Sequence, residues 1–325
     1  MDYTNERVAI RFDDGIEVSR PWLAADDRRA QRVLRTHRTE RVQCLCTPHG
    51  VPMHVVCRDG RFFLATNPGR ASHHALSCPA YHPDEETSGL RHYSDYALTR
   101  AGGRHKLLVR NHAPAGPPYE HFSFSAALQF IWEFAGLNVC TPKTVARRNF
   151  VAVSSSINRI SHKLRFNEEA LRLFVPRVTD DIEGCRYAIG QLGKTFHGEF
   201  ANGVRLAADR SHTFWIDQAQ WEGSDLEHHL GPYQEPHRQQ TTWIMGRLWR
   251  SPMGNYRLFD IGLLPVNDQL LPAQPGTIVA LAKLVENKRR FFVCQRYDAV
   301  DDETVPLAVL IDRQEPQVVS YPLRS

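Results

Sequence analysis

The chain has 325 residues, of which 42% are hydrophobic and 23% charged, and it carries a formal net charge of +4. This length suits two or three domains with packed cores, and the slight positive charge permits a nucleic-acid partner without requiring one. No stretch reaches the ~18 apolar residues of a membrane span, and no apolar run of a secretion signal follows Met1. We therefore expect a cytoplasmic protein with no membrane partner.

The first predicted elements are a hairpin and a helix. Residues 8–12 and 16–18 read as short strands that flank the turn sequence Asp13-Asp14-Gly15. Residues 24–36 read as a helix because apolar residues recur at helical spacing, namely Ala30, Val33 and Leu34. The other face of this helix is rich in arginine, which is typical of a solvated surface.

Cysteine usage indicates metal binding. The chain has seven cysteines, an odd number, and four of them fall within residues 44–78. Such clustering favours a metal site over a disulfide framework. The three scattered cysteines are expected to be buried thiols: Cys140, Cys185 and Cys294.

Two pairs of candidate metal ligands stand out in this segment. The first pair is Cys44 and Cys46, and the second is His74 and Cys78. Structural zinc sites take four Cys or His ligands in a tetrahedron, and each pair can supply two of them from one tight turn or one helical turn. The spacing predicts one structural Zn²⁺ held by these four residues.

The segment between the two pairs supports this prediction. Residues 53–57 and 61–65 read as strands joined at Asp59-Gly60, a strong turn signal because both residues tolerate positive φ. A hairpin here would bring the two ligand pairs together, as in a zinc ribbon. Residues 1–112 are therefore predicted to form a zinc-ribbon-like module.

Other nearby residues leave alternatives open. Cys57 could be a ligand, although its mid-strand position also suits a core side chain, and His73 lies beside His74. Three more histidines occur close by: His49, His54 and His82. A lone histidine in such a segment is more often a surface residue than a ligand. Without a metal, the same pattern would describe buried free thiols and surface histidines.

A linker and a clear helix follow. Residues 113–118 have the sequence Ala-Pro-Ala-Gly-Pro-Pro, which is typical of a linker and places a domain boundary there. Residues 123–136 predict a helix that Ser123 or Ser125 caps and Gly136 ends. Its apolar face comprises Ala127, Leu128, Ile131, Trp132 and Ala135.

A basic segment comes next. A second helix is predicted over about residues 144–166, and with the first it resembles a helix-turn-helix in outline. Between Thr141 and Arg177, eight Lys and Arg stand against two Glu, a net charge of +6. These cations, with hydroxyls at residues 154–156, could bind the phosphates of DNA, although an ordinary charged helix face is the alternative. The predicted nucleic-acid-binding residues of this helical region, residues 119–176, are Lys143, Arg147, Arg148, Arg159, Lys163 and Arg165.

Beyond residue 176 the pattern changes to strands. They are predicted at residues 187–192, 204–207, 213–216, 242–249, 256–261, 290–295 and 305–312, with a loop at 224–241 and a helix at 277–287. Residues 177–325 therefore read as a mixed α/β sheet domain, and the whole chain reads as an α+β protein.

One motif within these strands invites a different interpretation. Gly190 to Thr195 resembles the end of a phosphate-binding loop, Gly-x-x-x-x-Gly-Lys-Ser/Thr. The first required glycine falls at Ala188, and no helical pattern follows Thr195. The positive helix end that would hold a phosphate is missing, so we expect no nucleotide hydrolysis.

Four motifs together resemble an uncharacterised bacterial family carried on integrative conjugative elements and plasmids, whose members are marked by three N-terminal cysteines. In chain order they are Cys44-x-Cys46, His74-x-x-x-Cys78-Pro79, residues 128–138 and Arg296-Tyr297-Asp298. The resemblance implies an accessory protein of a mobile element, with other proteins of that element as partners. It also favours Cys44, Cys46, His74 and Cys78 over Cys57 as ligands.

The end of that family is similar to a PD-(D/E)xK nuclease core, in which acids on adjacent strands hold a divalent metal that activates water. This chain departs from the pattern. Leu307 stands where the aspartate would fall, and Leu323 where the later glutamate would fall. The remaining acids lie in a predicted loop: Asp298, Asp301, Asp302 and Glu303. These departures argue against cleavage.

The sequence thus predicts a zinc-binding accessory protein of a mobile genetic element that binds nucleic acid without cleaving it. One alternative is a metal-dependent PD-(D/E)xK-type DNA nuclease whose acids surround a C-terminal cleft, with Asp260, Asp298 and Asp312 as candidates. The other is a protein-interaction component of a conjugation or defence complex, in which the zinc is purely structural.

Overall fold

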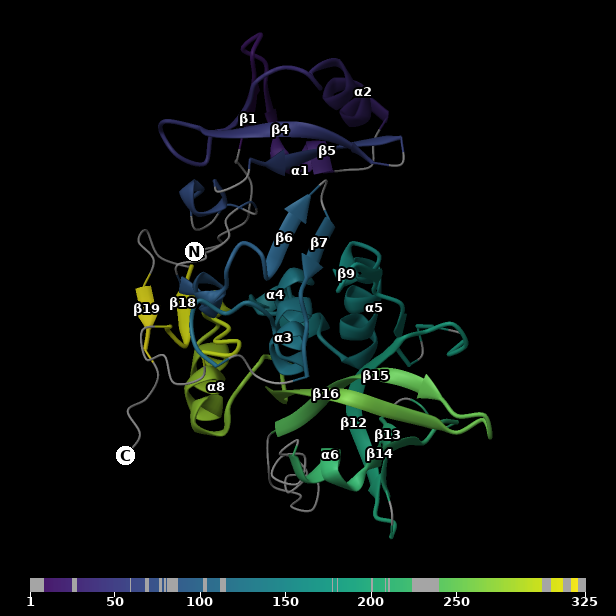
Figure 1. Ribbon diagram of the computed structural model, residues 1–325. Coiled ribbons are helices and arrows are strands. Elements are labelled where there is room, and N and C mark those ends of the chain that lie inside the picture. Colours follow the sequence, from purple (N-terminus) through teal and green to yellow (C-terminus); the bar gives the residue numbers. More distant parts are fainter. Residues whose placement is uncertain are drawn as a thin grey trace. The chain divides into compact units, whose positions relative to one another are not determined.

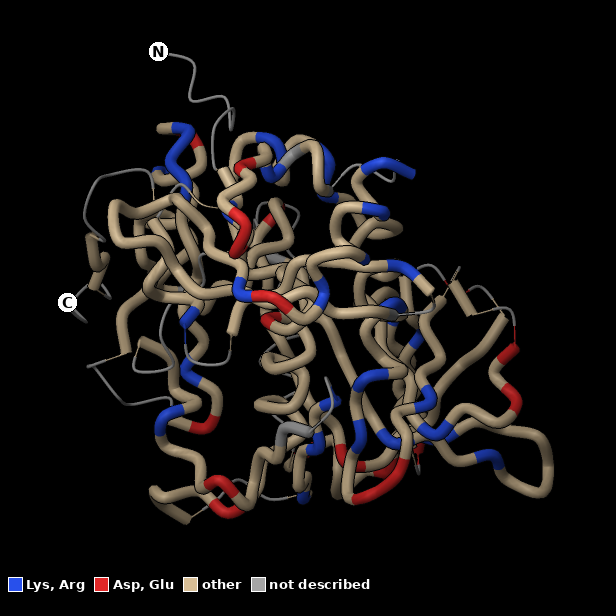
Figure 2. Tube along the Cα trace, turned by 90° about the horizontal axis from the view of Figure 1, so that it is seen from above, with Lys and Arg blue, Asp and Glu red and all other residues tan. Residues whose placement is uncertain are grey.

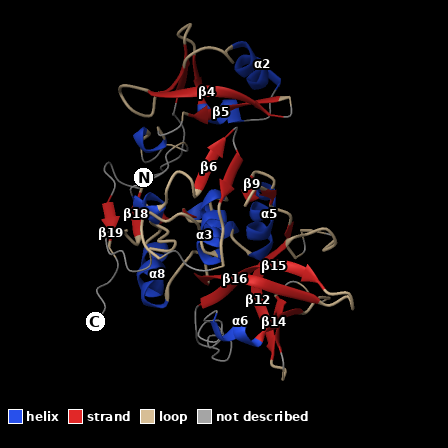
Figure 3. Ribbon diagram, viewed as in Figure 1, coloured by secondary structure: helices blue, strands red, loops and turns tan. Residues whose placement is uncertain are grey.

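The computed structural model is a mixed α+β protein, as predicted (Figure 3). It divides into two compact units, Met1–Asp84 with Val309–Gln317 and Glu85–Ala308 with Val318–Ser325. The linker predicted at residues 113–118 falls inside the second unit. The structure describes residues 9–320 except 25–27, 59, 68–69, 76–77, 79, 81–86, 102–103, 112–114, 177, 180, 200, 208, 210, 224–239, 300–304 and 312–316. No helix within these residues is long and apolar enough to cross a membrane.

The first unit is built on a five-stranded antiparallel sheet of order β2-β1-β3-β4-β5 (Figure 1). Its elements are β1 (Ala9–Phe12), β2 (Glu17–Ser19), α1 (Arg20–Ala24), α2 (Arg28–Thr36), β3 (Val42–Cys44), β4 (Val51–Arg58), β5 (Arg61–Thr66) and the 3-10 helix η1 (Ala71–His73). Both predicted hairpins, β1–β2 and β4–β5, are confirmed. Their turns use Gly15 at φ 81° and Gly60 at φ 76°, which glycine adopts without steric cost.

The core of this unit lies between α2 and the sheet. Leu34 of α2 is fully buried with Ile10 and Phe12 of β1 and Val42 of β3, and Ala30 is buried as well. The exposed arginines of α2 point away from this core, as predicted for a solvated face.

The second unit begins with the 3-10 helix η3 (Gly89–His92) and a sheet of order β10-β9-β7-β6. Its remaining elements combine short helices with runs of strands (Figure 1). They are β6 (Leu98–Ala101), β7 (Arg104–Leu107), α3 (Phe124–Phe134), β8 (Val139–Cys140), α4 (Pro142–Arg147), α5 (Phe150–Ser161), β9 (Leu164–Phe166), β10 (Glu169–Ala170), β11 (Leu173–Phe174), β12 (Tyr187–Phe196), β13 (Ala201–Leu206), β14 (Phe214–Asp217), α6 (Gln218–Gly223), β15 (Gln240–Arg250), β16 (Tyr256–Asn267), the 3-10 helix η4 (Pro275–Thr277), α8 (Ile278–Glu286) and β17 (Phe291–Val293). Strands β18 (Ala308–Leu310) and β19 (Gln317–Val319) lie at the two ends of the segment Val309–Gln317, which belongs to the first unit. The predicted strands and the helix near residue 278 are confirmed, with shorter or longer bounds. The loop predicted at residues 224–241 lies almost entirely outside the described residues.

Helix α3 forms where the sequence predicts the clearest helix. The Ser123 side chain accepts a hydrogen bond from the Ala126 backbone N–H at 3.1 Å, and Gly136 follows the helix at φ 71°. Trp132 is fully buried against Trp243 of β15, with ring centroids 5.0 Å apart. The main core of the unit therefore lies between α3 and the strands that it contacts, β15 and β16.

The prediction of one helix over residues 144–166 is wrong. The segment forms two helices, α4 and α5, and then strand β9. Asn149 separates the helices because its side chain caps α5 by accepting from the Ala152 N–H at 2.9 Å. Leu164 and Phe166 alternate into the core as strand residues and pair with β7.

The largest sheet closes on itself. Its order is β11-β12-β13-β14-β16-β15, and β12 also pairs with β15. Five strands thus form a small barrel in the order β12-β13-β14-β16-β15. Along the chain, α6 follows β14 and precedes β15. The pair β14–β16 is parallel, and the other pairs of the barrel are antiparallel. The barrel interior is apolar: its buried residues include Leu192, Val204, Phe214, Ile216 and Leu258.

The glycines of the rejected phosphate-loop motif have a structural role in this barrel. Gly190 and Gly193 lie within β12, not in a loop before a helix. A Cβ at Gly193 would lie 2.9 Å from the Ala207 Cα. The strand also carries a bulge between Leu192 and Lys194, where its pairing moves onto β13. Glycine lets β12 bend between its two partners.

Candidate metal centre

Four side chains of the first unit form a compact cluster. They are Cys44, Cys46, His74 and Cys78, and their ligand atoms all lie within 4.8 Å of one another. Within the described residues this is the one group of three or more Cys, His, Asp or Glu side chains close enough to hold a metal ion. The cluster contains all four residues that the sequence predicts as zinc ligands.

Strand pairing and one helical turn bring the cluster together. Cys44 is the last residue of β3, where it pairs with Ile10 of β1 and Val51 of β4. Cys46 lies in the turn that follows. His74 follows η1 in an extended conformation, and the Cys78 N–H donates to the Ala75 carbonyl at 2.8 Å. The second ligand pair therefore comes from one compact loop, as its spacing predicts.

The distances fit a tetrahedral zinc site. Bonds of about 2.3 Å to sulfur and about 2.0 Å to nitrogen place two sulfurs about 3.8 Å apart and sulfur and nitrogen about 3.5 Å apart. The Cys44 and Cys78 sulfurs are 3.7 Å apart. The His74 Nδ1 is 3.3 Å from the Cys46 sulfur and 3.5 Å from the Cys78 sulfur. Zn²⁺ is therefore a metal that this donor set and spacing can hold.

The electrostatics of the cluster favour a cation. Hydrogen bonds from Cys46 and Cys78 hold the pKa of the Cys44 thiol well below its usual range. The hydrogen bond to Cys44 raises the pKa of Cys78 far above its usual range. Burial lowers the pKa of His74, but hydrogen bonds to Cys44 and Cys46 and the charge of those sulfurs raise it to about 9. Thiolates this close repel one another, and a divalent cation would stabilise all three.

Neighbouring groups supply further positive potential to the sulfurs. The Arg20 guanidinium of α1 lies 3.9 Å from the Cys44 sulfur and 3.7 Å from the Cys78 sulfur. The Ala75 and Ala80 backbone N–H groups donate to the Cys46 and Cys78 sulfurs at 3.3 and 3.4 Å. Three thiolates with a bound Zn²⁺ would carry a net charge of −1, which Arg20 would balance. Sequence reasoning missed Arg20 because it lies 24 positions before Cys44 and only the fold brings the two together.

The alternative ligands lie outside the cluster. Cys57 is exposed on β4. His54 hydrogen-bonds through Nδ1 to the Asn67 side chain at 2.7 Å, and the His73 Nδ1 lies 3.1 Å from an Arg70 nitrogen. His49 is exposed, and His82 falls outside the described residues. The structure therefore separates the four clustered residues from the other candidates.

One family matches the segment that carries this cluster. Residues 18–109 match the model of a family described as a protein of unknown function, DUF1173. All four cluster residues and Arg20 lie within the matched segment. No curated protein and no solved structure matches the chain.

The two candidate nuclease acids that the structure describes, Asp260 and Asp298, have different partners. Asp260 is buried in β16, where its carboxylate pairs with the Arg247 guanidinium at 2.9 Å. Asp298 accepts hydrogen bonds from the Tyr93 hydroxyl and, at 3.0 Å, from the Ser123 N–H at the start of α3. Asp312, with Asp301, Asp302, Glu303 and Leu323, lies outside the described residues. Leu307 is fully buried.

Asp298 therefore has a structural task, and its removal should lower stability. We expect Asp298→Ala to cost about 1–3 kcal/mol, because it leaves the Tyr93 hydroxyl and the Ser123 N–H without their acceptor. Asp298→Asn should cost less, since its amide oxygen can still accept. Urea denaturation of the three proteins measures the difference. Equal stability of wild type and Asp298→Ala would contradict this role.

The six basic residues predicted to bind nucleic acid differ in their surroundings. Arg148 is half-buried: its guanidinium donates to the Val139 carbonyl at 2.7 Å and the Leu270 carbonyl at 3.4 Å, and burial lowers its pKa. Lys163 is half-buried. Four residues are exposed: Lys143 and Arg147 on α4, Arg159 on α5 and Arg165 on β9. The Ser154 hydroxyl, counted among the phosphate-binding groups, is fully buried.

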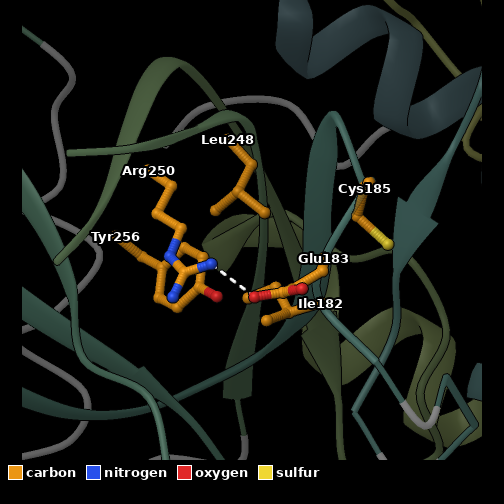
Figure 4. Close-up of a pocket in the computed structure, with 7 residues that line it drawn as sticks. Ile182, Glu183, Cys185, Leu248, Arg250 and Tyr256 are labelled. Carbon is orange, nitrogen blue, oxygen red and sulfur yellow. Dashed lines mark hydrogen bonds and ion pairs between the residues drawn. The ribbon is translucent and has the colours of Figure 1, made fainter. Parts of the chain in front are cut away.

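A small pocket in the second unit is lined in part by an ion pair. It is lined by Ile182, Glu183, Gly184, Cys185, Leu248, Arg250 and Tyr256. The Arg250 guanidinium pairs with Glu183 and lies over the Tyr256 ring, 5.8 Å from its centroid (Figure 4). Burial raises the pKa of the Cys185 thiol, so it is protonated near neutral pH and is a poor nucleophile.

The scattered thiols are buried, as predicted, in two of three cases. Burial raises the pKa of Cys140 to about 11 and that of Cys294 to about 12. Cys185 is half-buried.

Proposed function

We propose that Cys44, Cys46, His74 and Cys78 bind one Zn²⁺ that stabilises the first unit. The observation that carries this proposal is the closeness of the four ligand atoms, which all lie within 4.8 Å of one another, with three S···S and S···N distances of 3.3–3.7 Å that match a tetrahedral site. With four protein ligands the coordination is closed, which is the pattern of a structural rather than a catalytic site. Zinc bound there supplies positive charge to the three thiolates, and the residues themselves hold β3 to the loop after η1.

Metal analysis tests the proposal directly. Protein purified without chelator should carry about one zinc per chain, and Cys46→Ser should carry far less because zinc sites depend on a full set of thiolate ligands. Cys57→Ser is the matched control, since Cys57 lies in the same unit, outside the cluster. Wild-type protein without zinc, or equal zinc in Cys46→Ser and wild type, would overturn the proposal.

We further propose that the protein binds nucleic acid through the exposed cations of α4 and α5. Lys143, Arg147 and Arg159 are exposed, and the segment around them carries an excess of positive charge. Arg148 is excluded because its guanidinium is held by backbone carbonyls. Figure 2 shows basic and acidic positions interspersed along the trace, so binding would depend on this local excess and not on the net charge of +4.

Salt dependence measures these contacts. Each phosphate contact on duplex DNA contributes about −0.9 to the slope of log affinity against log salt. Replacing Lys143, Arg147 and Arg159 with alanine should weaken binding to all duplex sequences and flatten the slope by up to about three units. Alanine at the exposed Lys283 and Lys288 is the control. An unchanged slope in a triple variant with a wild-type melting temperature would rule this surface out.

The resemblance to proteins of conjugative elements supports a role as an accessory protein of such an element, inside the cell and beside its other proteins. Asp260 pairs with Arg247, and Asp298 accepts from the Ser123 N–H, so these two interactions give no support to the nuclease alternative. Incubation of plasmid DNA with the protein and Mg²⁺ or Mn²⁺ tests it: we expect intact DNA.

A further inference from the structure

The outer surface of the barrel carries aromatic and cationic side chains on neighbouring strands. Cα partners in paired strands present their side chains on the same face. Trp215 of β14 is the partner of Arg257 of β16, and Arg257 is the partner of Trp249 of β15. These three side chains therefore form one row across β14-β16-β15. The intervening residues Phe214 and Leu258 point into the barrel core.

The row continues onto β13 and β12. Gly203 of β13 is the partner of Trp215, and a Cβ there would lie 3.3 Å from the indole ring, so the ring lies against the glycine backbone. Arg205 lies on the same face, two residues along β13. Its guanidinium carbon is 4.9 Å from the centroid of the Phe196 ring, and its Nε donates to the Thr213 hydroxyl at 2.9 Å.

We call Phe196, Arg205, Trp215, Arg257 and Trp249 the outer band. All five are exposed or half-exposed, and Trp249 is 45% exposed although it is one of the largest apolar side chains. The flanking residue Phe259 meets the Trp249 ring edge-on, with centroids 6.4 Å apart. Single exposed aromatics are ordinary, but here aromatics alternate with arginines across five neighbouring strands.

The charge of the band is positive. Arg205, Arg257 and the neighbouring Lys194 carry it, and Lys194 and Arg257 are exposed. Among the described residues two acids lie on this face: Asp260 pairs with Arg247, and Asp217 accepts from the Gln220 N–H at 2.8 Å. The Asp217 carboxylate keeps its charge, but the three cations outnumber it. Arg250, on the opposite face of β15, is held by Glu183 and does not contribute (Figure 4). The face therefore offers aromatic rings, on which planar groups can stack, and cations, which attract negative charges. A ligand that fits it has both planar groups and several negative charges.

We propose that the outer band binds single-stranded nucleic acid. Unpaired bases stack on exposed aromatic rings, and phosphates lie against arginine and lysine. Trp249 and Trp215 would each stack a base, while Arg257, which lies between them, and Arg205 would contact the backbone. A duplex hides its base faces, so stacking on this surface requires single strands. This proposal uses residues other than those of α4 and α5 and is independent of duplex binding.

Fluorescence anisotropy with labelled fifteen-nucleotide dT and rU strands tests it. The full-length protein should bind at least one of the two, and the comparison shows whether the band prefers DNA or RNA. Loss of one stacked base typically costs about tenfold or more in affinity, so Trp249→Ala should weaken binding about tenfold, while Trp249→Phe should retain most of it. Arg257→Ala should flatten the salt slope by about 0.7, the value for one phosphate of a single strand.

Controls separate this surface from others. Tyr96 is 70% exposed and lies in the same unit outside the band, so Tyr96→Ala should bind like wild type. Tryptophan fluorescence should be quenched by the strand in wild type and less in Trp249→Phe. The proposal is overturned if wild type binds neither strand, if Trp249→Ala and Tyr96→Ala bind equally, or if only the variants of α4 and α5 reduce binding. It is also overturned if sedimentation shows a dimer that Trp249→Ala dissociates, because a second copy would then cover the band.

Discussion

Replacing Cys78 with serine is expected to unfold the first unit while the second unit stays folded. Structural zinc contributes apparent binding free energies of about 10–16 kcal/mol in small zinc domains, as much as the whole stability of about 5–15 kcal/mol of an ordinary domain. The core of this unit is small, and Cys44 and Cys78 are themselves part of it. Loss of the metal would leave close-packed thiols that repel one another when ionised.

Hydrogen exchange followed by mass spectrometry resolves the two units. Peptides from β1 to β5 should lose protection in Cys78→Ser and in wild type treated with chelator, and added zinc should restore only the wild type. Peptides from α3 and β12 should exchange as before. Cys57→Ser is the control, because Cys57 is exposed and outside the cluster. If the first unit keeps its protection without metal, the site does not stabilise the fold.

The metal cluster and helix α3 could be predicted because their signals are local. Cys44 and Cys46 are close in sequence, as are His74 and Cys78, and one hairpin is enough to join the pairs. Helix α3 was predictable from its cap and its apolar period. The break at Asn149 was missed because apolar residues continue at helical spacing into Leu164, which in the structure is a strand residue.

The barrel and the outer band could not be predicted from local patterns. Trp215 and Arg257 become neighbours only through the parallel pair β14–β16, and β12 closes the barrel by pairing with β15. The sequence shows each strand but not its partner, since many pairings satisfy the same alternation. For the same reason Arg148 reads as a surface cation, although its guanidinium binds the Val139 and Leu270 carbonyls.

Substitution of Gly262 by alanine is expected to destabilise the second unit strongly. Gly262 lies in β16 where the strand meets the start of α3. A Cβ there would lie 2.3 Å from the Phe124 carbonyl carbon, 2.4 Å from its oxygen and 2.6 Å from the Ser125 nitrogen. All three atoms are backbone, so no side-chain rotation can relieve the clash. Helix α3 would have to move away from the sheet.

That movement would disturb contacts on both sides of the clash. The Leu263 N–H donates to the Ser125 hydroxyl at 3.0 Å, and Trp132 of α3 packs against Trp243. Overpacking costs about 1–3 kcal/mol, and an unpaired buried N–H adds about 1–3 kcal/mol, so we expect a loss of about 3 kcal/mol or more. At about 2–4 °C per kcal/mol for a unit of this size, the melting temperature should fall by about 6 °C or more. Gly276→Ala is the matched control, because a Cβ there meets no atom within 4 Å. A Gly262→Ala protein that melts together with Gly276→Ala would show that α3 does not pack on β16 as closely as the structure has it.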